Sequence, residues 1–459
     1  MNVLSPRWQA GVARRPINPP PGVELAGLGY YLNRTWERVR DNLNATALVL
    51  TDHLDNSIAL VALDLMYNDA AFTLKIRALV SAQTDILPEA ICVNCSHTHN
   101  APTAGFIRGC GEQNQPYLDF AARTAAEAVV EAWRKRQPAR LLSGQAELKD
   151  MTFNRADANG PVDTRVNILR VDTLAGRPLA VAVNFHSHCT AHMEIDLQAV
   201  SRDWTGEVVD QLEGALPGLT AIYLQGTCGD VNFRREFNNT DRRFEPARAI
   251  TKSSLSAFES AQPLAETGLA STALRIQLPT CPWTQQEIKT EREEGLYRLN
   301  SGDTKGWMEG LGRACVNLPH RLPLRYGGSV EKTVAALARF AVAWTDDALL
   351  KLESGPETLE TEVQAIRIGD AWLVAHGAEL FTSLGLSLRS RWKSQNLFML
   401  GFSNASIGYL PDAAEIQRRG YAAIQSPKCT GQFPFTADSG SAMVNGLLEA
   451  LDRVRNHTS

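Results

Sequence analysis

Short apolar runs separated by turns rich in glycine, aspartate and asparagine recur along the chain and predict antiparallel strand pairs. The second strand of each pair runs directly into polar residues. Side chains of binding and catalytic sites commonly lie at such strand ends, so we expect functional groups there. The predicted pairs are 47–50 with 58–63, 166–171 with 179–183, and 363–368 with 371–375.

Longer stretches with apolar residues at helical spacing alternate with these strands. We expect helices over 116–136 and over 204–212, the latter with Asp203 as N-cap, and a last helix capped by Asp438 or Ser439. Strands mixed with helices predict an α/β fold, with mixed β-sheets and flanking helices.

No low-complexity linker divides the chain, so we expect one catalytic domain over residues 1–459. The stretch 283–352 is mostly helical in pattern, and we interpret it as a helical insertion that covers one side of the site.

Composition narrows the possible partners. A net charge of -4 and a pI near 6.2 argue against a nucleic-acid partner. No apolar run approaches the roughly 18 residues that span a bilayer, and 1–8 lacks the apolar core of a signal peptide. We therefore expect a cytoplasmic protein without stable membrane insertion that acts on a small-molecule substrate. The oligomeric state stays open.

The eight cysteines include one C-x-x-C pair, Cys92 and Cys95. No second pair completes a zinc ribbon. Buried reduced thiols are the favoured interpretation, ahead of a redox or metal pair.

Two histidine clusters follow apolar runs that read as buried strands. The segments are 94–102 and 184–192, and together they hold five of the nine histidines. Histidine is the commonest metal ligand, so the two clusters predict a metal site. Their members are His97 and His99 in the first, and His186, His188 and His192 in the second.

An oxygen ligand and a glycine loop are the next candidates. Glu379 follows a buried strand, where a carboxylate is costly unless it is paired or bound to a cation; a helix N-terminal glutamate is an equal alternative. The loop 224–232 allows close backbone approach to a ligand, but ordinary tight turns look the same. Arg234 and Arg235 follow it. A solvated surface pair is the favoured interpretation, with binding of an anionic substrate group as the alternative.

Several further segments stand in a fixed order with these candidates. That order resembles the catalytic domain of the neutral/alkaline non-lysosomal ceramidase family, zinc amidases that hydrolyse N-acyl sphingosine. The segments that carry the resemblance are Leu28–Tyr30, Ser96–Pro102, Asn154–Ala156, Asn184–Thr190, Val200–Gly206, Gln225–Val231, Ala378–Thr382, Tyr409–Leu410 and Tyr421.

The resemblance implies a Zn²⁺ cofactor and assigns roles to seven residues. Zinc can polarise a carbonyl and activate water, donors such as arginine and tyrosine stabilise a developing oxyanion, and a histidine can move protons. The implied zinc ligands are His97, His188, Glu379 and Tyr409, and the implied catalytic residues facing the substrate amide are His99, Arg155 and Tyr421.

Departures from the family refine this expectation. Asn232 stands where the family has a serine once considered a nucleophile, which favours metal-activated water over a covalent acyl-enzyme. Only a short stretch follows Tyr421, so we expect no further C-terminal β-sandwich domain. No lipid-handling feature is apparent, so we expect a small, polar, soluble substrate.

We therefore predict a zinc-dependent hydrolase that cleaves an N-acyl amide, although iron or manganese also suits such ligands. Two alternatives stay open: an ester or lactone hydrolase or sugar deacetylase on the same site, and a catalytically silent ligand-binding homologue. His186 and His192 are expected to be supporting groups, and Asp64 and Asp230 have no assigned role. The remaining surface histidines are expected to be His53, His320 and His457.

Overall fold

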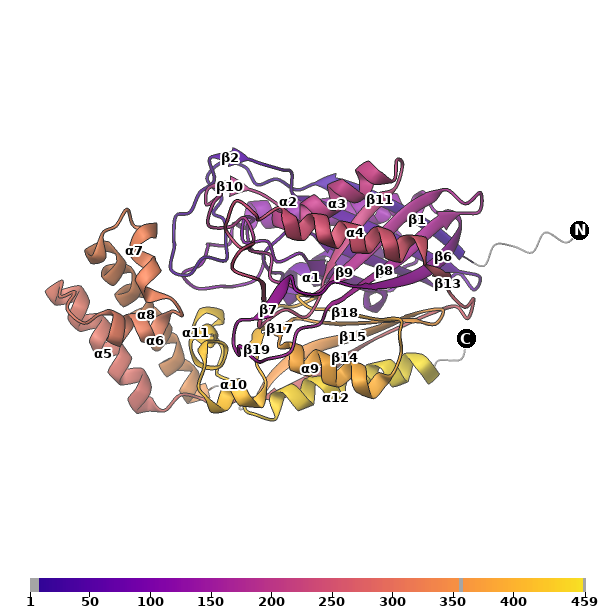
Figure 1. The fold of residues 1–459 in the computed structure, drawn as a ribbon. Coiled ribbons are helices and arrows are strands. Elements are labelled where there is room, and N and C mark those ends of the chain that lie inside the picture. Colours follow the sequence, from indigo (N-terminus) through magenta and orange to yellow (C-terminus); the bar gives the residue numbers. More distant parts are fainter. Residues whose placement is uncertain (1–7, 355–357, 457–459) are drawn as a thin grey trace, which may run out of the picture.

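The computed structural model describes residues 8–354 and 358–456, and its layers run helix, sheet, sheet, helix (Figure 1). The fold is α/β with mixed sheets, as predicted. The large sheet has nine strands in the order β11-β9-β8-β6-β1-β3-β4-β5, with β13 paired to β6. These strands are β1 (Trp8–Pro16), β3 (Asn44–Asp52), β4 (Ser57–Leu63), β5 (Ile91–Cys95), β6 (Gln137–Glu147), β8 (Arg165–Thr173), β9 (Pro178–Phe185), β11 (Thr220–Gln225) and β13 (Gln262–Pro263).

A second sheet packs against the large one, and the main core lies between them. Ile366, Leu373 and Phe398 of this sheet share one buried cluster with strands of the large sheet. Because both faces of the interface are apolar, most of the stabilisation from burial is concentrated there. The second sheet has the order β14 (Leu269–Pro279), β15 (Thr358–Ile368), β16 (Ala371–His376) and β18 (Leu397–Leu400).

Helices cover the outer faces of both sheets. On the large sheet, α1 (Ala70–Ser81) packs on α2 (Gln115–Arg134), while α3 (Asp203–Ala215) and α4 (Glu245–Glu259) cover the strands from β6 to β11. On the second sheet, α9 (Thr382–Trp392) packs beside α12 (Ser439–Asn456).

The sequence predicted these elements well. All three predicted strand pairs are antiparallel neighbours. Asp203 is the exception: it does not act as an ordinary N-cap, because it has a φ of 54° and its carboxylate accepts the backbone N–H groups of Ala191 and His192. That carboxylate holds the second histidine cluster as well as the start of α3.

The large sheet is splayed, and its two edge strands meet near the site. β1 pairs with β3 along its whole length but with β6 only over Trp8–Ala10. At the other side, the Asn94 side chain accepts the N–H of Gln225 at 2.8 Å and donates to the carbonyl of Gly401 at 2.6 Å. One asparagine on β5 therefore joins edge strand β11 and the second sheet.

The predicted helical segment is helical and lies at the end of the molecule away from the C-terminal end of α12 (Figure 1). It has its own apolar cluster, which also takes in Tyr30 and Cys110 from the body of the fold. Its helices are α5 (Gln285–Ser301), α6 (Arg313–Cys315), α7 (Leu322–Arg325) and α8 (Val330–Ser354), with the π-helical turn η2 (Met308–Gly312) and the short η3 (Pro319–Arg321) between them.

Sequence-based expectations also covered exposed histidines, cysteines and membrane-spanning helices. His53 and His320 are exposed as predicted, whereas His457 and residues 1–7 lie outside the described residues. All eight cysteines are free thiols and only Cys281 is exposed. Within residues 8–354 and 358–456, no helix combines the length and the apolar character needed to cross a bilayer.

Candidate metal centre

Three histidines from the two predicted clusters are oriented by backbone carbonyls. His97 lies just after β5 with a left-handed φ of 60°, and its Nδ1 is 3.1 Å from the carbonyl of Met66. The Nδ1 of His99 is 2.8 Å from the carbonyl of Gly27, and that of His188 is 3.0 Å from the carbonyl of Cys228. In each ring Nδ1 donates to the carbonyl, which leaves the Nε2 lone pair free.

The three free nitrogens converge. The Nε2 of His97 is 3.1 Å from that of His188 and 3.2 Å from that of His99. Two nitrogen ligands, each about 2.0–2.1 Å from a tetrahedral zinc ion, lie about 3.3 Å apart. Burial lowers the pKa of His99 to about 3 and lowers those of His97 and His188 well below their usual value, so all three are neutral donors. This buried group could hold a metal ion.

Glu379 supplies an oxygen to the same point. Its Oε2 is 3.5 Å from the Nε2 of His97 and 3.4 Å from that of His188, and it has no hydrogen-bond partner among the described residues. Its Oε1 accepts the hydroxyl of Tyr67. Burial raises the pKa of Glu379 well above its usual value. A buried carboxylate oxygen without a partner is costly, and a cation would remove that cost. The donor set therefore fits a divalent ion with nitrogen and oxygen ligands.

Tyr409 is held beside Glu379 by a small parallel sheet of β17 (Ala378–Leu380) and β19 (Gly408–Leu410), in which the two residues are register partners. Its hydroxyl is 3.4 Å from the Nε2 of His188. Arg155 donates through Nη2 to that hydroxyl at 2.6 Å and to the carbonyl of Gly229 at 2.8 Å. The ring of Tyr421 meets that of Tyr409 edge-on, with centroids 5.9 Å apart.

Gln225 ties the two histidine clusters together. Its side-chain amide donates to the carbonyl of Ser96 at 3.2 Å and to that of Ser187 at 3.0 Å, and these residues immediately precede His97 and His188. Because Gln225 is fully buried, both contacts are shielded from water.

The glycine loop 224–232 packs against the backbone of the Glu379 segment. Gly229 donates its N–H to the carbonyl of Leu380 at 3.0 Å, and a Cβ at position 229 would lie 2.4 Å from the carbonyl oxygen of Glu379. Asp230 accepts the N–H of Thr382 at 2.8 Å and the side-chain amide of Asn154 at 2.6 Å. This carboxylate therefore links the Glu379 segment to the residue that precedes Arg155.

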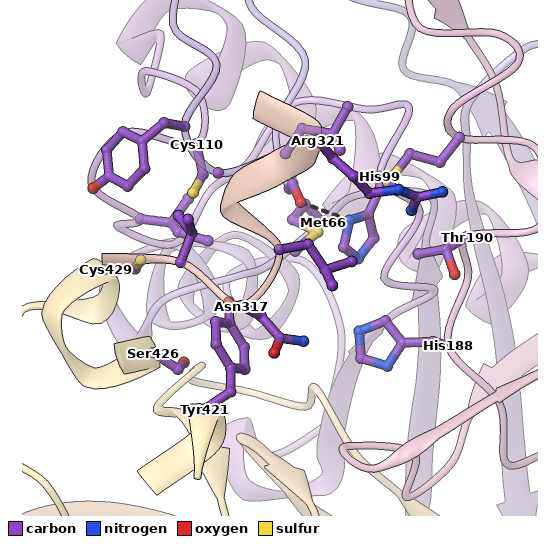
Figure 2. A pocket seen from close by; sticks show the side chains of 18 of the residues that line it. Met66, His99, Cys110, His188, Thr190, Asn317, Arg321, Tyr421, Ser426 and Cys429 are labelled. Atoms are coloured by element: carbon purple, nitrogen blue, oxygen red, sulfur yellow. Dashed lines mark hydrogen bonds between the residues drawn. The ribbon is translucent and has the colours of Figure 1, made fainter. Parts of the chain in front are cut away.

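The candidate residues border one cavity of about 220 Å³. Figure 2 shows the imidazoles of His99 and His188 facing the same space as Tyr421 and Asn317. Six of the seven predicted residues line it, and His97 lies buried beneath. Residues of the helical segment form part of the cavity wall. Its lining residues are Cys315, Val316, Asn317, Leu318, Arg321, Leu322 and Arg325.

The other candidate side chains lie elsewhere. The Nδ1 of His186 accepts the N–H of Thr227 at 3.0 Å, and that of His192 accepts from Arg40, so both rings stabilise loops. Asp64 accepts the N–H of Asn44 at 2.9 Å. Arg234 and Arg235 are exposed and do not border the cavity.

Sequence reasoning missed Tyr67 and the polar residues of the helical wall. It also assigned His99 to the substrate alone, whereas the Nε2 of His99 lies within the group that could hold a metal ion. Only the alternation of histidines in 97–99 hinted at this third imidazole.

The chain is similar in sequence and in fold to neutral ceramidases. Over 251 residues the chain is 26% identical to neutral ceramidase A of Dictyostelium discoideum, a match that covers 46% of this chain and 34% of that relative. The resemblance to neutral ceramidases is confirmed. No protein-family model matches the chain.

Two solved structures share this ceramidase-like fold. One is a ceramidase complexed with C2, with a TM-score of 0.69, 15% identity, and coverage of 99% of this chain and 76% of that one. The other is a neutral ceramidase from Pseudomonas aeruginosa, with a TM-score of 0.70, 15% identity, and coverage of 98% and 75%.

Proposed function

We propose that the chain is a zinc-dependent hydrolase that cleaves an N-acyl amide bond of a small polar substrate. The observation that carries the proposal is the convergence of three Nε2 atoms and the partnerless Oε2 of Glu379 beside one cavity. The ceramidase relative supports an amide as the bond that is cleaved. The modest volume of the cavity favours a small substrate over one enclosed along its full length.

In this proposal His97, His188, Glu379 and Tyr409 hold the ion. When bound, zinc would polarise the acyl carbonyl and lower the pKa of water to about 7. The protein's contribution is to hold neutral imidazoles and one carboxylate in fixed positions, through the carbonyl and Tyr67 contacts described above.

The chain's own groups then act on the substrate. Arg155 is fixed by Gly229 and Tyr409, so its guanidinium can donate to the oxygen that becomes negative as the acyl carbon turns tetrahedral. Tyr421 borders the same space and is a second donor. The Nδ1 of His99 is tied to Gly27, so this ring exchanges protons at Nε2 only. We assign it the transfer of a proton from the attacking water to the leaving amine.

The first experiment is elemental analysis of purified protein. We expect about one metal ion per chain in the wild type and in His320→Ala, an exposed-surface control, and loss of metal in His188→Ala. Metal retained in His99→Ala supports the proton-transfer role, whereas metal lost there makes His99 a ligand.

A substrate panel tests the chemistry. The zinc-loaded protein is assayed on N-acyl amides beside matched esters and lactones. Preferred cleavage of amides supports the proposal. Preferred cleavage of esters or lactones would instead identify the protein as an ester or lactone hydrolase. If the metal-loaded protein cleaves none of the amides, the proposed amidase activity is contradicted.

A further inference from the structure

Positive charge is in excess around the cavity before any ion is added. The charged residues that line it are three arginines, Arg155, Arg321 and Arg325, and two glutamates, Glu194 and Glu379. Glu379 faces the imidazoles, and Glu194 pairs with Arg321 at 3.0 Å. Among the described residues, neither carboxylate forms an ion pair with Arg155 or Arg325.

Arg325 carries the most informative of these charges. It lies at the end of α7, where its Nη1 donates to the carbonyl of Gly29. Among residues 8–354 and 358–456 no carboxylate forms an ion pair with it. Burial lowers its pKa, although Glu194 partly opposes this effect. A half-buried guanidinium whose hydrogen bonding within the described part of the chain is to a neutral carbonyl retains unused hydrogen-bond donors.

Arg34 adds a second charge behind the first. It is only 1% exposed, and its Nη2 donates to the carbonyls of Ala26 and His99. Its Nε and Nη1 have no hydrogen-bond partner in the described part of the chain. Burial and the nearby charge of Arg325 lower the pKa of Arg34 to about 9. Glu24 opposes this effect at Arg34 as Glu194 does at Arg325, but among the described residues neither carboxylate forms an ion pair with these guanidinium groups, so an anion between them would stabilise both.

The backbone places this charge close to the reacting groups. The carbonyl of Gly27 holds His99, and the carbonyl of Gly29 holds Arg325. Residues two apart in a chain are separated by at most about 7 Å. The Arg325 guanidinium and the His99 ring are thus anchored to the same short stretch of loop.

We propose that Arg325, with Arg34 behind it, binds an anionic group of the substrate a few atoms from the scissile amide. The inference rests on the proposed hydrolase function and narrows its substrate class to acylated amines that bear a carboxylate or phosphate, such as N-acyl amino acids. Guanidinium groups bind both oxyanions through paired N–H donors. Arg234 and Arg235, the anion-binding alternative from the sequence, are exposed and lie outside the cavity.

Kinetics on matched compounds test the inference. Zinc-loaded wild type is assayed on N-acetylglycine, on its neutral carboxamide N-acetylglycinamide, and on N-acetyl-2-aminoethyl phosphate. We expect kcat/KM for an anionic compound to exceed that for the neutral one by about tenfold or more, and Arg325→Gln to remove the difference. The preferred anion identifies carboxylate or phosphate as the group.

Three comparisons separate binding of an anion from support of the loop. Arg325→Gln should lower kcat/KM for the anionic compounds much more than for the neutral one, whereas a purely structural role would lower it by the same factor for all three compounds. Arg325→Lys keeps the charge and should keep part of the preference. Arg235→Gln removes an exposed arginine and should match wild type.

Binding to metal-depleted protein distinguishes the two possible failures. The change in Tm on adding each compound is measured for wild type and for Arg325→Gln. A larger shift with the anionic compounds, abolished in the variant, sustains the subsite even if no amide is cleaved. Equal Tm shifts with neutral and anionic compounds would contradict the anion-binding site. The hydrolase proposal would still be tested separately by the substrate panel.

Discussion

Glu379 and Tyr409 are register partners in a two-stranded parallel sheet, so their side chains leave the backbone on the same face. This pairing of strands thirty residues apart in the sequence fixes a carboxylate and a phenol beside His188.

Glu379→Gln should separate metal affinity from stability. Burial raises the pKa of Glu379 and so favours its neutral form in metal-free protein, and glutamine resembles that form in shape and charge. We expect an unchanged Tm without metal but affinity for zinc lowered by about 100-fold, close to 3 kcal/mol. Titration of Tm with zinc measures this, with the exposed Glu360→Gln as control. Equal zinc-induced shifts in both variants would exclude Glu379 as a ligand.

Tyr67→Phe should weaken metal binding without loss of the fold. The variant removes the hydroxyl that donates to Oε1 of Glu379 and keeps the ring, which stacks near Phe402. Loss of a group that orients a ligand typically lowers metal affinity by about 10–100-fold. Competition with a zinc chelator measures the change, and Tyr297→Phe is the matched control on an exposed tyrosine. Wild-type affinity in Tyr67→Phe would show that Glu379 needs no such support.

Gln225→Leu should lower both stability and metal binding. It leaves the buried carbonyls of Ser96 and Ser187 without this donor. We expect the free energy of unfolding to fall by about 2–3 kcal/mol, as for other buried groups left unsatisfied. Urea denaturation of metal-free protein is the measurement, with the exposed Gln277→Leu as control. A loss confined to metal affinity would mean that Gln225 positions the histidines but contributes little to the fold.

Acid should destabilise the metal-free protein, in part through His376. Burial lowers the pKa of this histidine to about 4 from an ordinary value of 6.5. The folded state therefore binds fewer protons than the unfolded chain between these values. The stability that His376 contributes is fully present above pH 6.5 and is lost as the pH falls towards 4, at most about 3 kcal/mol.

His376→Leu tests this by removing the titrating group while keeping a buried side chain of similar size. We expect the free energy of unfolding, measured by urea denaturation from pH 7 to pH 4, to fall less steeply in the variant. Parallel curves for wild type and His376→Leu would assign the acid sensitivity to other buried histidines, such as His186.

Local sequence predicted the strand ends at which the histidine clusters lie. Glu379 follows strand β16 as predicted, but it is the central residue of the short strand β17, which no pattern marked. Apolar runs and turn residues determine where strands stop, so these positions follow from short-range information. Tyr67 could not be predicted in this way, because its partner Glu379 lies on a different sheet and no polar pattern marks it.

The role of Gln225 and the cavity wall needed the tertiary structure for a similar reason. Gln225 belongs to a recognisable motif, but its role depends on two carbonyls in the loops that follow β5 and β9. Arg325 sits in a helical segment whose packing against Gly29 cannot be deduced from periodicity. Asp203 was misjudged as a cap because the histidine loop competes for its carboxylate.

The meeting of the two edge strands at Asn94 and Gln225 also bears on the order in which the molecule assembles. His97 and His188 follow strands from opposite halves of the splayed sheet, so their rings come together only when that long-range seam has closed. Contacts of such wide sequence separation form late and slowly during folding. Capture of an ion at these rings would thus report completion of the tertiary structure, and nascent or truncated chains that lack either half would leave the ion in solution.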